Sequence, residues 1–399
     1  MKIIIISYYY EPRLGYQEPN LTRELAKLGH DVYLITSNKR YPPGISHKSL
    51  SLSIGERTVK EGFFVEGKVK VIRLKSIFEI FSRTWLKNLE KTLIELKPDV
   101  VVVNSVTRFS SFRVPFLKWR KKLDFTLVYD EHMVYSVVRQ NLLGKIFYFL
   151  FRLIVRPLLL SQGNVFIAVT EETKVFMNRE CGIPLSSIEL VPLGVNQHLF
   201  KYDELSRKQL RSQYGISQED VVFIYAGKII AGKGPHLLID AGLKLLGKHK
   251  DLKLFFLGNG NEEYINKMKN KVEKNGFGTQ IIWDGAVNNK ELYKYYSAAD
   301  VGVWPLQESM TMLEAASCNL PIIVRDTLSL ADRISNGNGF GYKEGDMEDL
   351  AKYMEICLTN KELRKKMGAK GRELIEKRLN WEAVAKEYVK LYSKVPPRS

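Results

Sequence analysis

Residues 301–324, VGVWPLQESMTMLEAASCNLPIIV, decide the predicted fold of this chain. The stretch predicts a buried strand (VGVWP), a short polar loop, a helix from about Met310 to Cys318 and a second buried strand (PIIV). A strand, a crossover helix and a further strand form a βαβ unit, whose two strands are parallel. The fold class that follows is α/β with a parallel sheet.

The start of this helix has features of an anion-binding site. Ser309 is a favoured N-cap residue, and we expect its hydroxyl to accept hydrogen bonds from the first-turn amides. The amides around Met310 and Thr311, with the helix dipole behind them, attract anions. Glu314 follows one turn later, where its carboxylate suits hydroxyl groups on the same ligand. A sugar nucleotide carries both phosphates and vicinal hydroxyls, but an ordinary capped crossover helix fits the pattern as well.

Length and composition predict a soluble protein of two domains. The chain has 399 residues, of which 45% are hydrophobic and 26% charged. Its three cysteines are far apart, which favours a reducing, cytoplasmic compartment over a disulfide framework or a metal knuckle. The opening MKIIIISYYYEP is predicted to be a first strand rather than a signal peptide, because no small-residue cleavage site follows it. We expect no membrane span, because no apolar run is long enough.

The net charge of +17 indicates an anionic partner, although general solubility also explains it. Basic residues accompany large apolar residues in three segments, at 83–91, 118–122 and 142–160. Such segments suit an anionic membrane surface, so we expect peripheral attachment through the first half of the chain. A buried crossover helix is the alternative for residues 142–160. No nucleic-acid partner is expected, because the bases do not alternate with aromatic residues along one track.

Strand-like and helix-like segments alternate twice along the chain. In the first half the predicted strands are residues 2–7, 31–37, 69–73, 99–104, 125–130 and 165–169. In the second half they are residues 221–226, 253–257, 280–283, 300–304 and 321–324. Residues 191–200 look like a linker. Two Rossmann-like domains in tandem are therefore predicted, followed by a helical tail.

A second candidate phosphate site lies in IYAGKIIAGKGPHLLID, residues 224–240. A strand ends at Gly227, a loop holds Lys228 and Lys233, and a helix is predicted to start near Pro235. The spacing from Gly227 to Lys233 is that of a Walker A loop, but Gly234 stands where a Ser or Thr would bind magnesium. A nucleoside triphosphate hydrolase is therefore disfavoured. Two lysines on a strand-to-helix loop indicate a phosphate clamp, or else a solvated turn.

Several absent motifs narrow the chemistry. The chain has no Asp-x-Asp, no Gly-x-Ser-x-Gly and no His-Glu-x-x-His, and Gly-x-Gly-x-x-Gly is missing after both first strands. We therefore expect no bound metal and no cofactor. Without a metal, the charge of a leaving diphosphate must be stabilised by Lys228, Lys233 and helix amides.

The first half offers Asp130-Glu131-His132 at the end of a predicted strand. Ligands of open parallel sheets bind at the carboxyl ends of strands, so His132 is a candidate proton carrier or hydrogen-bond donor to a reacting sugar. A structural histidine is the alternative. Gly15, after the first strand, lies on the matching rim and would allow close approach of a ligand.

Taken together, these segments resemble the retaining glycosyltransferases of family 4, which have the two-domain GT-B fold. The resemblance covers essentially the whole chain. Its pieces, in order, are the loop from Pro12 to Gly15, KPDVVVV, VYDEH, IAVTEET, LVPLGVNQHLF, YAGKIIAGKG, FFLGNG, DGAVNNKELYKYYSAADVGVWP, LEAASCNLPIIV and NWEAVAKEYVKLY. The resemblance implies an acceptor-binding domain at residues 1–195, a donor-binding domain at 196–378 facing it across a cleft, and a helix at 379–399 that crosses back to the first domain.

The resemblance also implies roles for individual residues. Lys228 and Lys233, near Gly227, would hold the donor diphosphate together with the amides of Ser309, Met310 and Thr311. Glu314 would bind the ribose, and the backbone from Gly285 to Val287 would meet the base. His132 and Gly15 would face the transferred sugar. The residues assigned to catalysis are therefore His132, Lys233 and Glu314.

Three positions depart from the family pattern. The family usually has a glutamate eight residues before Glu314, where this chain has Leu306; Glu308 would take its place only if the loop shifts. Lys228 replaces an arginine and so loses a bidentate fork. The usual double glycine of the first loop is reduced to Gly15.

The predicted function is a retaining, metal-independent transfer of a sugar, of the hexosyltransferase type, from a nucleotide-sugar donor such as a UDP- or GDP-sugar. The acceptor is expected to be a glycan or a lipid-linked molecule, in cell-surface or membrane glycoconjugate synthesis on the cytoplasmic side of the membrane. The alternative is a non-catalytic polyanion- or membrane-binding protein that keeps a glycosyltransferase scaffold.

Overall fold

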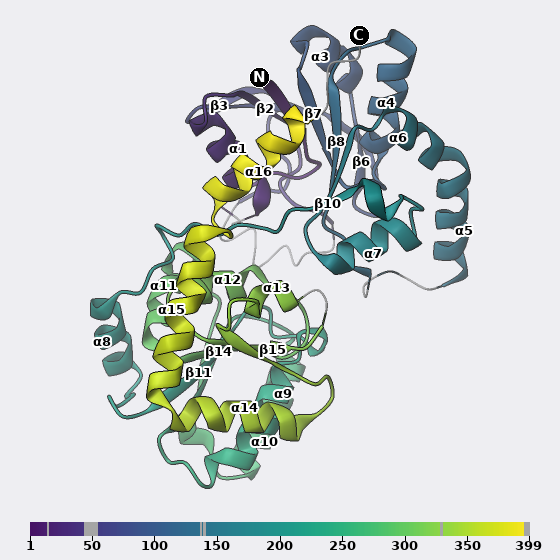
Figure 1. Ribbon diagram of the computed structural model, residues 1–399. Helices are drawn as coiled ribbons and strands as arrows, with labels where there is room; N and C mark the ends of the chain where they lie inside the picture. The colour runs from purple at the N-terminus through teal and green to yellow at the C-terminus, as the bar shows by residue number, and fades with distance from the viewer. Residues whose placement is uncertain (14–15, 44–54, 136–137, 139–140, 328–329, 395–399) are drawn as a thin grey trace. The chain divides into compact units, whose positions relative to one another are not determined.

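The computed structural model describes residues 1–13, 16–43, 55–135, 138, 141–327 and 330–394. Gly15 therefore lies outside the described residues. The chain divides into two compact units (Figure 1). Unit 1 comprises Met1–Leu193 together with Trp381–Ser399, and unit 2 comprises Gly194–Asn380. Within the described residues, no helix combines the length and apolarity needed to cross a membrane.

Unit 1 contains an eight-stranded sheet in the order β10-β9-β8-β7-β1-β2-β4-β3. Its strands are β1 (Lys2–Ile6), β2 (Asp31–Ser37), β3 (Gly62–Glu66), β4 (Val69–Leu74), β7 (Val100–Asn104), β8 (Thr126–Glu131), β9 (Val165–Ala168) and β10 (Ile188–Leu190). All neighbours are parallel except β3, which pairs antiparallel with β4. A separate hairpin is formed by β5 (Ser76–Ile80) and β6 (Arg83–Leu86).

The helices of unit 1 connect successive parallel strands. They are α1 (Gln17–Lys27), α3 (Leu89–Leu96), α4 (Phe109–Lys121), α5 (Leu142–Leu150), the π-helical turn η2 (Phe151–Val155), α6 (Arg156–Gln162) and α7 (Glu171–Arg179). The last helix, α16 (Trp381–Ser393), also belongs to unit 1, where it lies against α1 (Figure 1). The central strands are buried on both faces, as helices on both sides of a parallel sheet require.

Unit 2 contains a six-stranded, fully parallel sheet in the order β13-β12-β11-β14-β15-β16. Its strands are β11 (Val221–Ala226), β12 (Leu252–Leu257), β13 (Ile281–Asp284), β14 (Val301–Trp304), β15 (Ile322–Arg325) and β16 (Gly339–Tyr342). Its helices are α8 (Glu204–Gln213), α9 (Pro235–Leu246), α10 (Glu262–Lys274), α11 (Leu292–Ala298), α12 (Met310–Ser317), α13 (Ala331–Ile334), α14 (Met347–Thr359) and α15 (Lys361–Lys377).

The predicted α/β class and parallel sheets are confirmed, and each unit is Rossmann-like. The sequence did not predict β3, β5, β6, β10 and β16. Strand β3 (GFFVE) is exposed on both faces at the sheet edge, so it lacks the alternation that marks a half-buried strand. Strand β16 (GFGY) is rich in glycine, which weakens a strand signal.

Strand order places a topological switch point in each unit. In unit 1, β1 and β7 are neighbours, but the strands that follow them in the chain, β2 and β8, lie on opposite sides of this pair. In unit 2 the same holds for β11 and β14, which are followed by β12 and β15. Ligands of open α/β sheets bind beside the carboxyl ends of the strands at such points. The loops after β11 and β14 are those that the sequence indicated as phosphate-binding.

A buried carboxylate fastens α16 to the sheet of unit 1. Asp130, at the end of β8, accepts hydrogen bonds on Oδ2 from Gln17 Nε2 at 2.7 Å and from Tyr388 Oη at 2.9 Å. Asp130 and Tyr388 are at most 1% exposed. Since unpartnered buried charges are costly, these two bonds stabilise both the carboxylate and the docking of α16.

We expect Tyr388→Phe to lower the free energy of unfolding by about 1–3 kcal/mol, because Asp130 then loses one of its two donors. Urea denaturation measures this change. Tyr392→Phe is the matched control on the same helix: its hydroxyl is buried and has no partner among the described residues. Equal losses in the two variants would show that the bond to Asp130 does not fasten the helix.

Candidate functional site

The carboxyl ends of β11 and β14 are joined through one backbone carbonyl. The oxygen of Ala226 accepts a hydrogen bond from Trp304 Nε1 at 2.9 Å and another from Thr311 Oγ1 at 3.0 Å. Trp304 ends β14, and Thr311 lies in the first turn of α12. These bonds hold the start of α12 beside the loop that follows β11.

Ser309 stands at the N-cap of α12, as predicted, but the expected capping bond is wrong. Its side chain makes no capping hydrogen bond to the first-turn amides. Its hydroxyl lies 2.7 Å from Thr311 Oγ1 instead, so the two hydroxyls pair with each other. The amides around Met310 and Thr311 are therefore not satisfied by the Ser309 side chain, which suits an external anion.

Lys233 lies against this same helix start. It ends a 3₁₀ turn (Ala231–Lys233), and its ammonium donates to the carbonyl oxygen of Glu308 at 3.2 Å. Burial, followed by repulsion from Lys228, lowers the pKa of Lys233 below its ordinary value. Lys228 is exposed on the same loop, just after Gly227. The two ammonium groups make this loop positively charged. A bound anion would compensate Lys233 for the water that its ammonium loses on burial.

Leu306 and Glu308 show how the loop before α12 accommodates the departure from the family pattern. Leu306 packs on Gly234: a Cβ added to this glycine would lie 2.7 Å from Leu306 Cγ. Glu308 turns away and forms an ion pair with the buried Arg333, whose Nε lies 3.1 Å from Oε1. Its carboxylate is thus engaged within unit 2. No local pattern indicated Arg333, which lies on α13.

Glu314 is buried within α12, with 4% of its surface exposed. Asn289 Nδ2 donates to Oε1 at 2.9 Å, and Tyr296 Oη donates to Oε2 at 3.2 Å. Burial raises the pKa of Glu314 to about 7, although the two hydrogen bonds act in the opposite direction. Asn289 and Tyr296 were missed in the sequence, because they lie a helix earlier and match no spacing rule.

Gly285 and Val287 follow β13, at the same edge of the sheet. The amide of Gly285 donates to Asp284 Oδ1 at 2.7 Å, and that of Ala286 to Asn259 Oδ1 at 3.1 Å. The loop from Gly258 to Gly260 after β12 runs against the β11 loop. A Cβ at Gly258 would lie 1.9 Å from the Gly227 carbonyl oxygen, so only glycine fits. The pair of glycines in FLGNG was the available sequence signal for this close approach.

In unit 1, His132 lies at the carboxyl end of β8. Its Nε2 is 3.4 Å from Asp130 Oδ1, and 35% of its side chain is exposed. Desolvation lowers the pKa of His132, but the combined attraction of Asp130, Glu18 and Glu131 outweighs this effect and raises the pKa above its ordinary value. The carboxylate of Glu131 accepts hydrogen bonds from nearby loop groups, from Ser105 Oγ at 2.9 Å and from the amide of His132 at 2.9 Å.

The candidate residues therefore form two groups. Unit 2 brings together Gly227, Lys228, Lys233, Ser309, Met310, Thr311 and Glu314 around the β11 and β14 ends, with Gly285 and Val287 along the same edge. Unit 1 presents His132 at the end of β8. Each group lies where its own sheet is expected to bind a ligand.

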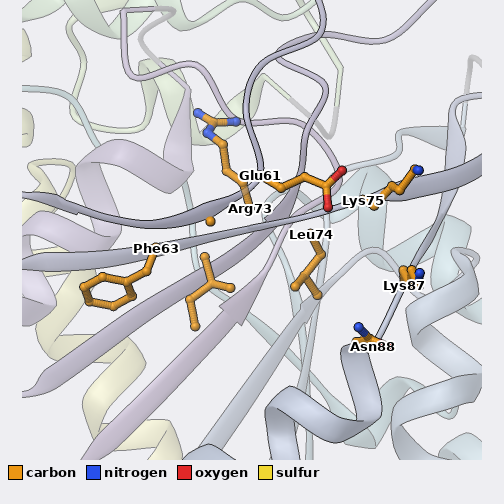
Figure 2. A pocket seen from close by; sticks show the side chains of 9 residues that line it. Glu61, Phe63, Arg73, Leu74, Lys75, Lys87 and Asn88 are labelled. Atoms are coloured by element: carbon orange, nitrogen blue, oxygen red, sulfur yellow. The ribbon is translucent and has the colours of Figure 1, made fainter.

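A hollow of about 430 Å³ lies elsewhere in unit 1 (Figure 2). Phe63 of β3 lies at one end of it, and Lys75, Lys87 and Asn88 lie at the other. None of the candidate residues lines it.

Comparison with known proteins matches both halves of the chain to sugar-transferring families. The family described as Glycosyltransferase Family 4 matches residues 20–199, and the family described as Glycosyl transferases group 1 matches residues 206–374. The spore coat protein SA of Bacillus subtilis is 26% identical over 200 residues, which are 47% of this chain and 52% of that protein. The chain thus spans about half the length of the first curated relatives it matches.

Two further similarities extend over the whole chain. The GPI3 subunit of phosphatidylinositol N-acetylglucosaminyltransferase from Saccharomyces cerevisiae is 22% identical over 410 aligned residues, covering 100% of this chain and 84% of that protein. The structure of HepE from Anabaena in complex with UDP superposes with a TM-score of 0.74 at 14% identity, covering 99% of this chain and 100% of that one.

The buried Glu314 leads to a prediction about stability and pH. A carboxyl whose pKa is about 7 when folded and 4.5 in its ordinary state binds more protons folded than unfolded between these values. Its contribution to the free energy of unfolding therefore falls as the pH rises through this window. We expect Glu314→Gln to gain stability relative to the natural protein between pH 5 and pH 8, by up to about 3 kcal/mol.

Urea denaturation at the two pH values measures this difference. Glu262→Gln, at the exposed start of α10, is the control and should show no such change with pH. A constant difference between Glu314→Gln and the natural protein across the window would contradict the raised pKa.

The two family matches and the Rossmann-like fold of both units agree, and the chain belongs to the family 4 (group 1) glycosyltransferases with the GT-B fold.

Proposed function

We propose that the chain is a retaining, metal-independent glycosyltransferase that moves a sugar from a nucleotide-sugar donor to a glycan or lipid-linked acceptor. The observation that carries this proposal is the cationic site in unit 2. There, Lys233 touches the carbonyl of Glu308 directly before α12, whose first-turn amides lack side-chain caps. An ammonium group and helix amides are the groups that stabilise a leaving diphosphate when no metal does so.

The nucleotide would occupy the carboxyl edge of the unit 2 sheet. Its diphosphate would bind to Lys233, Lys228 and the amides around Thr311. Its ribose would bind to Glu314, and its base would contact the backbone from Gly285 to Val287. HepE, which has a similar fold, is described in complex with UDP and with UDP-glucose. This supports a nucleotide-sugar donor, for which either a UDP- or a GDP-sugar is proposed.

The transferred sugar is proposed to lie against His132, with Gly15 allowing its close approach. The raised pKa of His132 keeps part of the imidazole protonated near neutral pH, so that the ring donates a hydrogen bond to the sugar. The departing phosphate would take the acceptor's proton on the same face, and the anomeric configuration would be retained. No cofactor is proposed.

The acceptor is proposed to be lipid-linked or a glycan of the cell surface, reached from the cytoplasmic side of an anionic membrane. The similarity to a subunit named for phosphatidylinositol N-acetylglucosaminyl transfer supports a lipid acceptor. The family match of both halves does not favour the alternative of a non-catalytic binding protein. A nucleoside triphosphate hydrolase is also disfavoured, since Gly234 has a φ of +73° and lies under Leu306.

Donor hydrolysis by the purified protein tests the proposal. We expect slow release of free sugar from one nucleotide sugar, unchanged by a chelator such as EDTA, with an α-configured donor giving first an α-configured product by NMR. Thermal shift with UDP, GDP and other nucleoside diphosphates should identify one stabilising nucleotide. An inverted first product, or activity lost to EDTA and restored by Mg²⁺, would contradict the mechanism.

The contacts of the two lysines predict unequal effects on activity. Lys233→Ala should lower kcat/KM by about 100-fold or more, because Lys233 is positioned by the Glu308 carbonyl and its charge is poorly solvated. Lys228→Ala should cost about tenfold or less, because its side chain is exposed. Steady-state kinetics with the identified donor measure both.

Lys248→Ala provides the matched control, since it removes an exposed ammonium just beyond the far end of α9. It should leave kcat/KM unchanged. Small and equal losses for Lys228→Ala and Lys233→Ala would place the diphosphate elsewhere.

A further inference from the structure

Helix α5 and the turn η2 are apolar on almost every side but bury only one strip. Tyr148 and Phe151, three positions apart, are 7% and 5% exposed and belong to the hydrophobic core of unit 1. Tyr148 packs edge-on against Phe176 of α7. On the remaining faces, the most exposed apolar side chains are Leu142, Leu143, Phe149, Leu153 and Ile154, at 59–76%. The alternative of a simple buried crossover helix therefore does not hold for α5 and η2.

The β5–β6 hairpin extends this surface. Ile77, Ile80 and Phe81 are 56%, 52% and 81% exposed. The guanidinium of Arg83, in β6, lies 5.2 Å from the centre of the Phe147 ring in α5, so the hairpin and the helix are neighbours. We call the exposed apolar side chains of α5, η2 and this hairpin the apolar face. Exposed apolar side chains on neighbouring elements differ from the single, scattered ones of an ordinary protein surface. Figure 1 shows α5 at the periphery of unit 1.

The charge around the apolar face is positive. No Asp or Glu occurs between Glu131 and Glu171, and Lys145 is exposed among the apolar residues of α5. Arg152 is held by the carbonyl oxygens of Arg179 and Glu180, at 3.2 Å each, so it serves the packing of the helix. Lys145 has no carboxylate partner among the described residues and remains available to an external anion.

Two other basic segments are exposed only in part. Residues 83–91 are split between β6 and α3, and Leu86 and Leu89 are buried at 0% and 1%. Lys118 is 5% exposed and donates to the carbonyl of Phe125 at 2.6 Å. The exposed part of the second segment is Trp119 with Arg120, Lys121 and Lys122, at the end of α4, which packs against α6.

The apolar surface and its positive charge together favour an anionic bilayer over a second copy of this chain as the partner. A second copy of this chain seated face to face would bring the Lys145 ammonium groups together without carboxylates to pair with them. A bilayer with anionic lipids offers a hydrocarbon interior to the apolar side chains and phosphates to the bases. Because α5 packs along the protein through Tyr148 and Phe151, it would lie in the membrane plane.

We propose that the apolar face is a membrane-docking surface, whose side chains enter the interfacial region of an anionic bilayer while Lys145 contacts lipid phosphates. The inference deepens the proposed function, since a lipid-linked acceptor would reach unit 1 from the same bilayer.

Vesicle sedimentation tests the proposal with the full chain. The natural protein should bind vesicles of phosphatidylcholine and phosphatidylglycerol, and the double variant Leu153→Asp/Ile154→Asp should bind at least about 100-fold more weakly. Phe63→Asp/Val65→Asp is the matched control: these residues are 57% and 62% exposed on the edge strand β3 and should leave binding unchanged. Lys145→Gln should weaken binding about fivefold, and only to vesicles with the anionic lipid.

The possible results separate this inference from the proposed function. Donor hydrolysis without vesicles should be unchanged in Leu153→Asp/Ile154→Asp, and circular dichroism should confirm its fold. Hydrolysis without vesicle binding would overturn the docking surface alone, and vesicle binding without hydrolysis would overturn the enzyme alone. Equal binding by all variants would remove the apolar face as the docking surface. A dimer by light scattering that Leu153→Asp/Ile154→Asp converts to a monomer, without vesicle binding, would assign the face to a second copy.

Discussion

The carbonyl oxygen of Ala226 is the point on which the geometry of unit 2 depends. It accepts hydrogen bonds from the indole of Trp304 and from the hydroxyl of Thr311, and so ties the ends of β11 and β14 to the first turn of α12. Hydrogen bonds that hold a helix start in place reduce the reorganisation that its amides need when an anion binds. The lysine loop after β11 is held beside it by the bond from Lys233 to the Glu308 carbonyl.

Much of this arrangement could be predicted from local sequence. The apolar runs that end at Ala226 and Trp304 marked buried parallel strands, and strand order then brought their carboxyl ends together. Lys228, Lys233 and Thr311 followed directly, because each lies within a few residues of a strand end. The partners of these residues could not be predicted in the same way. Arg333 pairs with Glu308 across 25 residues, and Asn289 reaches Glu314 from the preceding connection. Such pairings depend on how whole helices pack, which no spacing rule records.

The sequence also could not show which side chains of Asp130-Glu131-His132 are buried in structural hydrogen bonds and which one is exposed. Three polar residues at a strand end look alike in the sequence, yet they differ in the structure. Asp130 is turned inward to Gln17 and Tyr388, and Glu131 caps the amides of its own loop, while His132 keeps an exposed edge. The negative charges of Asp130, Glu18 and Glu131 together raise the pKa of the His132 ring. An isolated surface histidine has no such neighbours.

The loop before α12 leaves no unpaired side-chain carboxylate among its described residues. The apolar side chain of Leu306 packs on Gly234. The carboxylate of Glu308 forms an ion pair with Arg333, which is 2% exposed. Breaking that pair to free the carboxylate would leave a buried charge on Arg333, which costs several kcal/mol. A sugar next to this loop would therefore meet an apolar side chain and an ion pair rather than an unpaired carboxylate. Hydrogen bonds from this loop to the hydroxyls of such a ligand would then have to come from its backbone groups.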